Sequence, residues 1–284
     1  MATYCMSDIH GHKLEFDIML SKIKFSKKDQ LYVLGDIIDR GYESAEMLMW
    51  AVDKAPSNIH FMMGNHEDIA REVIKRDPDT MDMEPEWDTW AFNGGEETAD
   101  SLYDLTTPKW RITRLIPWLD SLPVYKTLVV NKHRFMLVHA GFNPFNFEES
   151  TIEEEDLDLA TSKNHLREHM NIGYGFGQQS RNDMLWIRED WMYDYQKAPV
   201  TTIHGHTPTN WTMIDGLVSF GIQAQGGPGM IMKYMNKIDI DCGCAHDDNE
   251  AHALGCLRLD DLKEFYVPII PDELRFELSL RNKL

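Results

Sequence analysis

The sequence predicts an α/β fold in which parallel strands alternate with helices. Three short apolar runs are each followed by a stretch with helical periodicity, and each run ends in a polar cluster. These clusters start with Asp8, Asp36 and Gly64-Asn65, so they recur every 28 to 29 residues, close to the roughly 30 residues of a strand–helix–strand unit. Because the carboxyl ends of parallel strands meet at one edge of a sheet, we expect the three clusters to lie together.

The elements of the first half follow from this pattern. The expected strands are residues 3–6, 31–34 and 59–63, and the expected helices are residues 16–23, 44–52 and a third helix ending near residue 75. In the first helix the apolar positions follow the spacing i, i+3, i+4, i+7, which places them on one face. The repetition of this unit indicates a parallel sheet covered by helices.

The middle of the chain departs from this pattern. Residues 77–122 hold four tryptophans and the tripeptide Asn93-Gly94-Gly95, and we expect a helical insertion or flank with a helix around residues 96–105. We interpret the tryptophans and glycines as packing and turn residues. Residues 145–185 are expected to be loop-rich, with an acidic run at 148–158 that is interpreted as a solvated face.

The last part of the sequence is rich in strand patterns. The expected strands are residues 124–130, 135–138, 201–203, 237–241, 256–259 and 264–267, followed by an alternating tail at 274–280. Two of these strands end in His139-Ala-Gly and His204-Gly-His206, so five strand ends carry polar clusters.

The composition excludes some classes of function. At 284 residues with 43% hydrophobic residues, the chain is expected to form one domain, residues 1–284. Its net charge of −19, without a cluster of Lys or Arg, disfavours nucleic acid as a partner. No apolar stretch is long enough to span a membrane and no secretory signal precedes Asp8, so we expect a cytoplasmic protein. The sequence does not indicate an oligomeric state.

The cysteines allow two interpretations. Cys242, Cys244 and Cys256, with His246 and His252 nearby, offer ligands for a structural zinc ion. Their spacing does not form two CxxC pairs, however, and four cysteines are too few and too unevenly spaced for a disulfide framework. We therefore expect ordinary reduced thiols.

The polar clusters contain residue types that bind metal ions. Asp8 and His10 are two residues apart, so in an extended segment both side chains project to one face and suit one cation. Asp36 is a candidate bridge, because two oxygens of one carboxylate can hold two ions roughly 3.5–4 Å apart. Oxygen and imidazole ligands without thiolate suit Mn, Fe or Zn.

Five sequence blocks resemble a known family. The blocks S-D-I-H-G, G-D-I-I-D-R-G, G-N-H-E, V-H-A-G and G-H-T-P occur in this order and resemble the signature of the metallophosphoesterase superfamily. The form is that of bacterial and phage Ser/Thr protein phosphatases of the phosphoprotein phosphatase family, and the likeness covers residues 3–267. It implies one calcineurin-like domain, built as a β-sandwich of mixed sheets flanked by helices, with two bound divalent ions, Mn²⁺ first and Fe or Zn as alternatives.

The resemblance also implies roles for single residues. The first ion would be held by Asp8, His10 and Asp36, and the second by Asp36, Asn65, His139 and His206. His66 would protonate the leaving group, oriented by Asp39. Arg40 would grip the phosphate together with Arg188, which lies in a Trp-x-Arg block, because guanidinium groups match phosphate oxygens bidentately.

The expected activity is metal-dependent hydrolysis of a phosphomonoester by direct attack of a hydroxide bound to both ions. A phosphoserine or phosphothreonine protein is the first expected substrate, and small phosphoesters are others. The alternative is a diadenosine tetraphosphate hydrolase or another nucleotide phosphoesterase. Asp39 and Thr207 favour the phosphatase, because the bacterial form of that hydrolase usually lacks this aspartate and ends with G-H-W. A binding module without activity is disfavoured, because every expected position is filled.

Overall fold

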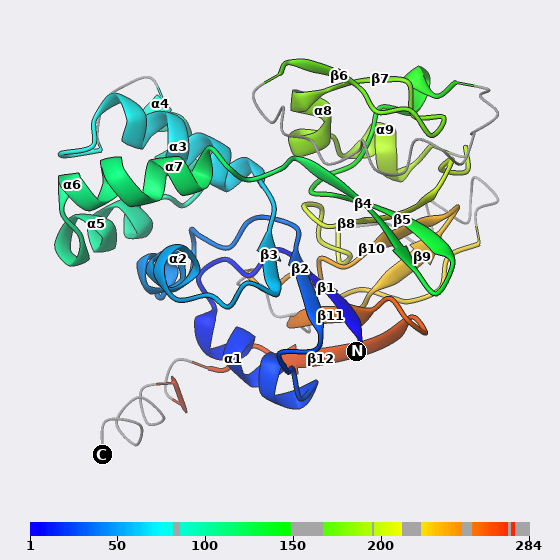
Figure 1. Cartoon of the computed structure of the whole chain (residues 1–284), viewed down its shortest axis with the longest axis horizontal. Coiled ribbons are helices and arrows are strands. Elements are labelled where there is room, and N and C mark those ends of the chain that lie inside the picture. The colour runs from blue at the N-terminus through cyan, green and yellow to red at the C-terminus, as the bar shows by residue number, and fades with distance from the viewer. Residues whose placement is uncertain are drawn as a thin grey trace.

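The computed structural model describes residues 1–81, 86–148, 167–194, 196–211, 223–245, 252–271 and 274–275. In these residues two five-stranded mixed sheets lie against each other, and helices cover their outer faces (Figure 1). The predicted α/β fold with mixed sheets flanked by helices is therefore confirmed.

The first sheet contains the three parallel strands that the sequence predicts. Its strand order is β12-β11-β1-β2-β3, with β1, β2 and β3 parallel and with β11 antiparallel to both β1 and β12. The strands are β1 (Thr3–Met6), β2 (Gln30–Val33), β3 (Ile59–Phe61), β11 (Ala253–Arg258) and β12 (Lys263–Pro268). The helices that follow the parallel strands are α1 (Lys13–Lys22), α2 (Ser44–Asp53) and α3 (Asn65–Arg76). Parallel pairing requires such crossover helices, so all three strands end at the same edge.

The second sheet brings two further polar strand ends to the same region. Its order is β4-β5-β8-β10-β9, with β5, β8 and β10 parallel and with antiparallel pairs at both edges. The strands are β4 (Tyr125–Val130), β5 (His133–Val138), β8 (Thr201–His204), β9 (Met232–Tyr234) and β10 (Lys237–Asp239).

The core has two layers because side chains alternate along each strand. Cys5 on β1 and Leu137 on β5 belong to a buried cluster between the sheets. Their neighbours Tyr4 and Val138 belong to a larger cluster that includes the helices. Both faces of β1 and of the end of β5 are thus buried, which explains the apolar runs at residues 4–6 and 135–138.

Residues of the expected insertion form helices beside α3 (Figure 1). They are α4 (Glu86–Phe92), α5 (Glu96–Leu105), α6 (Pro108–Trp110), a π-helical turn (Arg111–Leu115) and α7 (Ile116–Leu119). The buried guanidinium of Arg111 donates to the carbonyl oxygens of Pro78, Asp79 and Leu102 over 2.6–3.0 Å. One cation therefore ties the segment that follows α3 to the end of α5.

The segment expected to be loop-rich contains more regular structure than its sequence indicates. It includes a short 3-10 turn η2 (Pro144–Asn146), the hairpin β6 (His169–Asn171) and β7 (Gln178–Ser180), and the start of α8 (Arg181–Trp186), which α9 (Glu189–Met192) follows. These strands are too short for a periodic pattern to reveal them. Except for Glu148, the acidic run at 148–158 lies outside the described residues. So does most of the alternating tail, of which residues 274 and 275 are helical.

The four cysteines are expected from the sequence to be ordinary reduced thiols and not zinc ligands. All four cysteines are buried free thiols, and burial raises their pKa. Among the described residues they join no cluster able to hold a metal ion, although His246 is outside that range.

No helix in the described part of the chain is long and apolar enough to cross a membrane.

Candidate active site

The polar clusters of five strand ends meet at one place in the structure. All six residues expected to bind metal are buried there, and the side chains form a continuous set of contacts: Asp8, His10, Asp36, Asn65, His139 and His206. The parallel topology produces this convergence, because β1, β2 and β3 of one sheet and β5 and β8 of the other all point their carboxyl ends the same way.

The Asp36 carboxylate is shared by two groups that could each hold a metal ion. One group consists of His10, Asp36 and His66, and the other of Asp36, His139 and His206. In the first, His10 Nε2 lies 3.8 Å from Asp36 Oδ2 and 3.9 Å from Asp8 Oδ1. The Asp8 carboxylate therefore lies beside this group, although it is not one of its three members.

The second group is more compact. His139 Nε2 lies 3.3 Å from Asp36 Oδ2, 2.9 Å from Asn65 Oδ1 and 3.2 Å from His206 Nδ1. Four potential ligand atoms from four strand ends therefore surround a small volume. His204, two residues before His206, instead packs its ring against Trp191 with centroids 5.6 Å apart.

The imidazoles are oriented in the way that metal binding requires. His10 Nδ1 contacts the carbonyl oxygen of Ile38 at 2.8 Å, and His139 Nδ1 contacts that of Leu34 at 2.9 Å. A carbonyl can only accept, so each Nδ1 carries a proton, and Nε2 is the ring nitrogen that faces the cluster and can bind an ion once it has no proton. This donor set fits divalent ions of the Mn, Fe or Zn type.

The main chain of the site is held in a left-handed conformation that non-glycine residues rarely adopt. The backbone angle φ lies between 46° and 70° at six site residues, Asp8, His10, Asp36, Asp39, Arg40 and His206. Such strain persists only where surrounding contacts determine the conformation, and it concentrates at functional sites. Glycines allow the close approach: a Cβ added at Gly64 would overlap Asp36 Oδ1, and one at Gly205 would overlap Asp8 Oδ2.

Glu67 is a functional residue that the sequence analysis did not assign. Its buried carboxylate accepts hydrogen bonds from the backbone nitrogens of Asp36, Ile37 and Gly64 at 2.8, 2.8 and 3.0 Å. It therefore joins the loop after β2 to the start of α3. Burial raises the pKa of Glu67 to about 7. The sequence could have indicated this residue, because Glu67 is the last residue of the G-N-H-E block.

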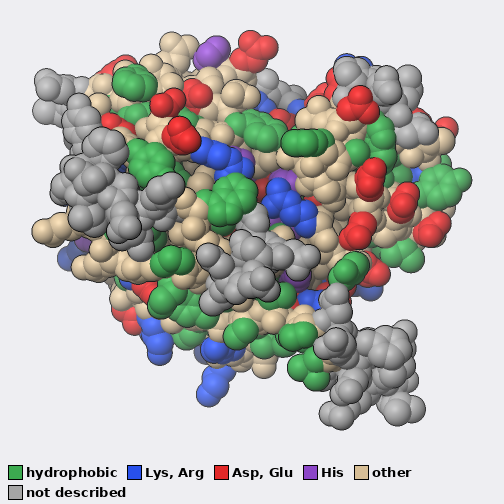
Figure 2. All heavy atoms as spheres, turned by 180° about the vertical axis from the view of Figure 1, so that it is seen from behind, with side chains coloured by type: hydrophobic (Ala, Val, Ile, Leu, Met, Phe, Trp, Pro, Cys, Tyr) green, Lys and Arg blue, Asp and Glu red, His purple; other side chains and the backbone are tan. Residues whose placement is uncertain are grey.

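His66 and two arginines border the cluster. His66 Nδ1 contacts Asp39 Oδ2 at 2.6 Å, and Arg40 places its two terminal nitrogens 3.1 Å from His66 Nε2 and from His10 Nε2. Arg188 donates from Nη1 to the carbonyl oxygen of His206 at 2.7 Å. Figure 2 shows one face of the molecule, on which Lys and Arg side chains lie beside histidines with hydrophobic side chains between them.

Charges within the cluster shift the pKa values of its members. Burial by itself would lower the pKa of His139, but the charge of Asp36 and the contact with it raise this pKa to about 9. Burial by itself would raise the pKa of Asp36, but His139 and His66 hold it well below its usual range. The pKa of His206 falls well below its ordinary value because of burial and the charge of His139.

Comparison with known proteins identifies the family. The family model described as calcineurin-like phosphoesterase matches residues 1–247. The chain belongs to this family. The cluster of His, Asp and Asn side chains at the converging strand ends is therefore the candidate active site of this family member.

Several curated relatives of this phosphoesterase carry the name symmetrical bis(5′-nucleosyl)-tetraphosphatase. That of Haemophilus ducreyi is 32% identical over 74% of this chain and 60% of the relative, and that of Buchnera aphidicola is 40% identical over 51% of this chain and 46% of the relative. The chain thus spans about half to three fifths of the length of these relatives.

Solved structures support the fold. A putative diadenosine tetraphosphatase shares 16% identity and a TM-score of 0.51, covering 95% of this chain and 94% of the other. A metallophosphoesterase from Sphaerobacter thermophilus shares 13% identity and the same TM-score, covering 100% of this chain and 94% of the other. At these identities the likeness concerns the fold alone.

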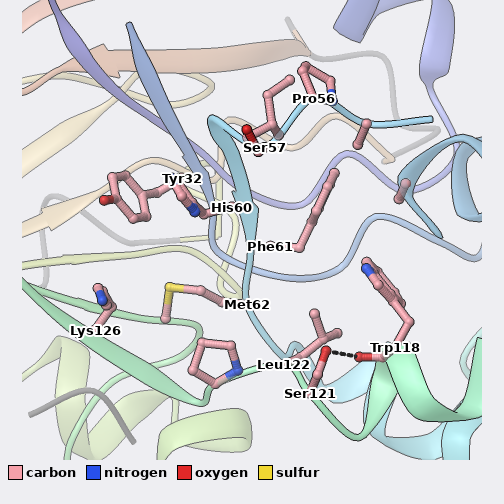
Figure 3. A pocket seen from close by; sticks show the side chains of 14 residues that line it. Tyr32, Pro56, Ser57, His60, Phe61, Met62, Trp118, Ser121, Leu122 and Lys126 are labelled. Atoms are coloured by element: carbon pink, nitrogen blue, oxygen red, sulfur yellow. Dashed lines mark hydrogen bonds between the residues drawn. The ribbon is translucent and has the colours of Figure 1, made fainter. Parts of the chain in front are cut away.

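Besides a cavity of about 810 Å³ beside β9 and β10, two smaller cavities lie outside the metal-ligand cluster. One of about 390 Å³ is next to it, lined by Asp68, Arg181 and Trp186, whose ring centroid lies 6.1 Å from that of His206. The other, of about 320 Å³, lies at the sheet edges formed by β3 and β4, where the rings of Tyr32 and His60 stack (Figure 3). None of the expected metal ligands lines the second cavity.

We expect metal binding to this phosphoesterase to release a proton. With its pKa at about 9, His139 is protonated at pH 7 before metal binds, and a proton on Nε2 competes with the ion. Affinity for Mn²⁺ should therefore rise with pH, by roughly tenfold per unit below pH 9 for one proton. Calorimetric titrations between pH 6.5 and 8.5, in buffers of different ionisation enthalpy, measure both quantities. An affinity independent of pH would contradict the role of His139 as a ligand.

A methyl group at Gly205 should weaken metal binding. In Gly205→Ala the new Cβ overlaps Asp8 Oδ2 and the Ser7 hydroxyl, so the Asp8 carboxylate must move. We expect at least about a tenfold loss in affinity for one ion, as for other changes that displace a ligand. Gly227→Ala is the matched control, because nothing lies within 4 Å of a Cβ there. Equal metal content and affinity in both variants would show that Asp8 does not bind metal.

Proposed function

We propose that this phosphoesterase cleaves nucleoside polyphosphates and that dinucleoside tetraphosphates, cut symmetrically, are its first substrates. The names of the relatives from Haemophilus and Buchnera support this choice. The observation that carries phosphoester hydrolysis is the shared Asp36 carboxylate, which joins two ligand groups beside two guanidinium groups. Such an arrangement attracts and orients a chain of phosphates more readily than a neutral ligand. The choice of a dinucleotide is carried by the Trp211 ring beside Arg188.

We assign the metal ligands as the family resemblance implies. The structure groups His66, and not Asp8, with His10 and Asp36, but we assign His66 to proton transfer. Asp8, His10 and Asp36 would hold the first ion, and Asp36, Asn65, His139 and His206 the second, with Mn²⁺ as the proposed metal. Two divalent ions bound by these residues would supply a nucleophile at neutral pH and would stabilise charge on the phosphoryl group.

The side chains around the ions carry the remaining steps. Arg40 and Arg188 would bind the phosphoryl oxygens through paired N–H groups. Once Arg40, which now faces His66 Nε2 and can only donate, turns to the phosphoryl oxygens, His66 would hold a proton on Nε2 for the leaving oxygen, while its Nδ1 stays bonded to Asp39. Burial alone would lower the pKa of His66, but the charges of Asp36 and Asp39 raise it above its ordinary value, which suits a proton donor.

An exposed tryptophan next to Arg188 supports a nucleotide substrate. The Arg188 guanidinium lies 5.6 Å from the ring centroid of Trp211, and about half of the Trp211 surface is exposed. An aromatic face beside a phosphate-binding cation offers a place for a base to stack while its phosphates reach the ions.

A phosphomonoester of serine or threonine in a protein is the second candidate. The 2.6 Å contact between His66 and Asp39 favours it, because an alcohol leaving group needs a proton far more than a nucleoside diphosphate does. Asp39 also favours a phosphatase over the dinucleotide hydrolase, because the bacterial form of that hydrolase usually lacks an aspartate at this position.

A parallel assay tests the proposal. The Mn²⁺-loaded enzyme is given diadenosine tetraphosphate, phosphoserine peptides and cyclic nucleotides, and the products are separated by chromatography. We expect the highest kcat/KM for the dinucleotide, with two molecules of ADP as products. A higher kcat/KM for the peptides would reject the dinucleotide and support the second candidate.

Replacing the shared carboxylate should abolish activity. Asp36→Asn keeps the shape of the side chain but removes the charge that both ligand groups share, so we expect at least about a 10³-fold loss of kcat and a lower metal content by atomic emission. Asp17→Asn, at an exposed carboxylate paired with Lys13, is the control. Full activity with two ions bound to Asp36→Asn would refute the bridging role.

Removal of the exposed ring tests the base-binding role. Stacking on an aromatic side chain contributes about 1–3 kcal/mol per base, so Trp211→Ala should raise KM for diadenosine tetraphosphate roughly 5- to 100-fold. KM for p-nitrophenyl phosphate should stay the same, and Trp211→Phe should retain most of the affinity for the dinucleotide. A similar rise in KM for both substrates would mean that the Trp211 ring orients the Arg188 guanidinium and does not bind a base.

A further inference from the structure

The carboxylate of Asp39 is held mainly by residues of the helical insertion. Thr98 Oγ1 on α5 donates to Asp39 Oδ1 at 2.7 Å, and the Asp39 backbone nitrogen donates to the same hydroxyl at 3.1 Å. Trp90 Nε1 on α4 donates to Asp39 Oδ2 at 2.9 Å. His66 Nδ1 contacts that second oxygen at 2.6 Å. Asp39, His66, Trp90 and Thr98 are all buried.

We propose that Trp90 and Thr98 are positioning residues, which set the orientation of His66 through Asp39. Three donors approach the carboxylate from three elements, so they determine both its place and the plane in which its oxygens lie. His66 is then directed with Nε2 3.1 Å from Arg40 Nη2 and 3.8 Å from Asp36 Oδ2. This inference rests on the proposed role of His66 as proton donor.

Two glycines let the main chain of the insertion come close to the loop that carries Asp39 and Arg40. The Arg40 nitrogen donates to the carbonyl oxygen of Gly94 at 3.0 Å. A Cβ at Gly94, whose φ is +88°, would crowd Arg40 Cγ, and a Cβ at Gly95 would overlap the Trp90 indole. The glycine pair therefore lets the insertion approach two successive residues of the active-site loop.

The alternative is that Trp90 and Thr98 only fill space. Trp90 packs edge-to-face against Trp87 with ring centroids 6.0 Å apart, so it does contribute to packing. Packing does not require a hydroxyl at position 98, however. Valine has nearly the same shape as threonine and would fill the same volume, but it offers Asp39 Oδ1 no donor. The two explanations thus predict different results for one substitution.

The kinetic test compares Thr98→Val with Thr98→Ser, which keeps the hydroxyl. A positioned general acid contributes about 10²–10⁴-fold, and Thr98→Val should lose part of this, about tenfold or more in kcat for phenyl phosphate, whose leaving group is poor. For p-nitrophenyl phosphate the loss should be within about threefold, with KM and metal content unchanged, since that leaving group needs little proton donation. Thr98→Ser should behave like the unaltered enzyme. Equal losses in both variants, or equal losses for both substrates, would overturn the inference.

A spectroscopic test does not depend on activity. In protein labelled with ¹⁵N-histidine, the His66 Nδ1 proton bonded to Asp39 should give a downfield resonance, assigned by its loss in His66→Asn. This resonance should persist in Thr98→Ser and should shift or broaden in Thr98→Val and in Trp90→Phe. If Thr98→Val does not fold, Trp90→Phe carries the same comparison. An unchanged resonance in the folded variants would overturn the inference. Failure of the unaltered enzyme to hydrolyse any phosphoester would instead overturn the proposed function.

Discussion

Asp36 Oδ2 lies 3.3 to 3.8 Å from imidazole nitrogens of His10, His66 and His139, which belong to three different strand ends. These distances hold only if the loops that follow β1, β2, β3 and β5 are fixed against one another. The backbone nitrogen of His66 donates to Asp36 Oδ1 at 3.1 Å, and Glu67 accepts from the Asp36 nitrogen. Helix α3 thus holds both the carboxylate and the main chain of Asp36.

The contacts around Asp36 require strained backbone conformations and a rigid support from the rest of the fold. Six site residues adopt the left-handed conformation that side chains disfavour, and glycines occupy the points of closest approach. Two packed sheets provide the support, because their central strands are buried on both faces and leave the loops little freedom. The helical insertion adds a third source of contacts, directed at Asp39 and Arg40.

The electrostatics of the site contrast with those of the whole chain. The protein carries a net charge of −19, yet Arg40 and Arg188 lie beside the ligand cluster, and two bound divalent ions would make this region cationic. The same centre suits a phosphomonoester and a polyphosphate, since both present phosphoryl oxygens to metal ions and guanidinium groups. Substrate choice must therefore depend on groups farther out, such as Trp211 and the residues of the cavity at Trp186.

The sequence by itself determined the fold class and the set of polar residues at the strand ends. Both follow from local periodicity, since a strand–helix–strand repeat of about 30 residues necessarily brings Asp8, Asp36 and Asn65 to one edge. Only the tertiary structure decided that Trp90 and Thr98 hold Asp39, across 51 and 59 residues of chain, and that Glu67 joins two loops. Such contacts join side chains of different elements, and no local pattern encodes them because the packing of helices against loops decides which donors reach a given carboxylate.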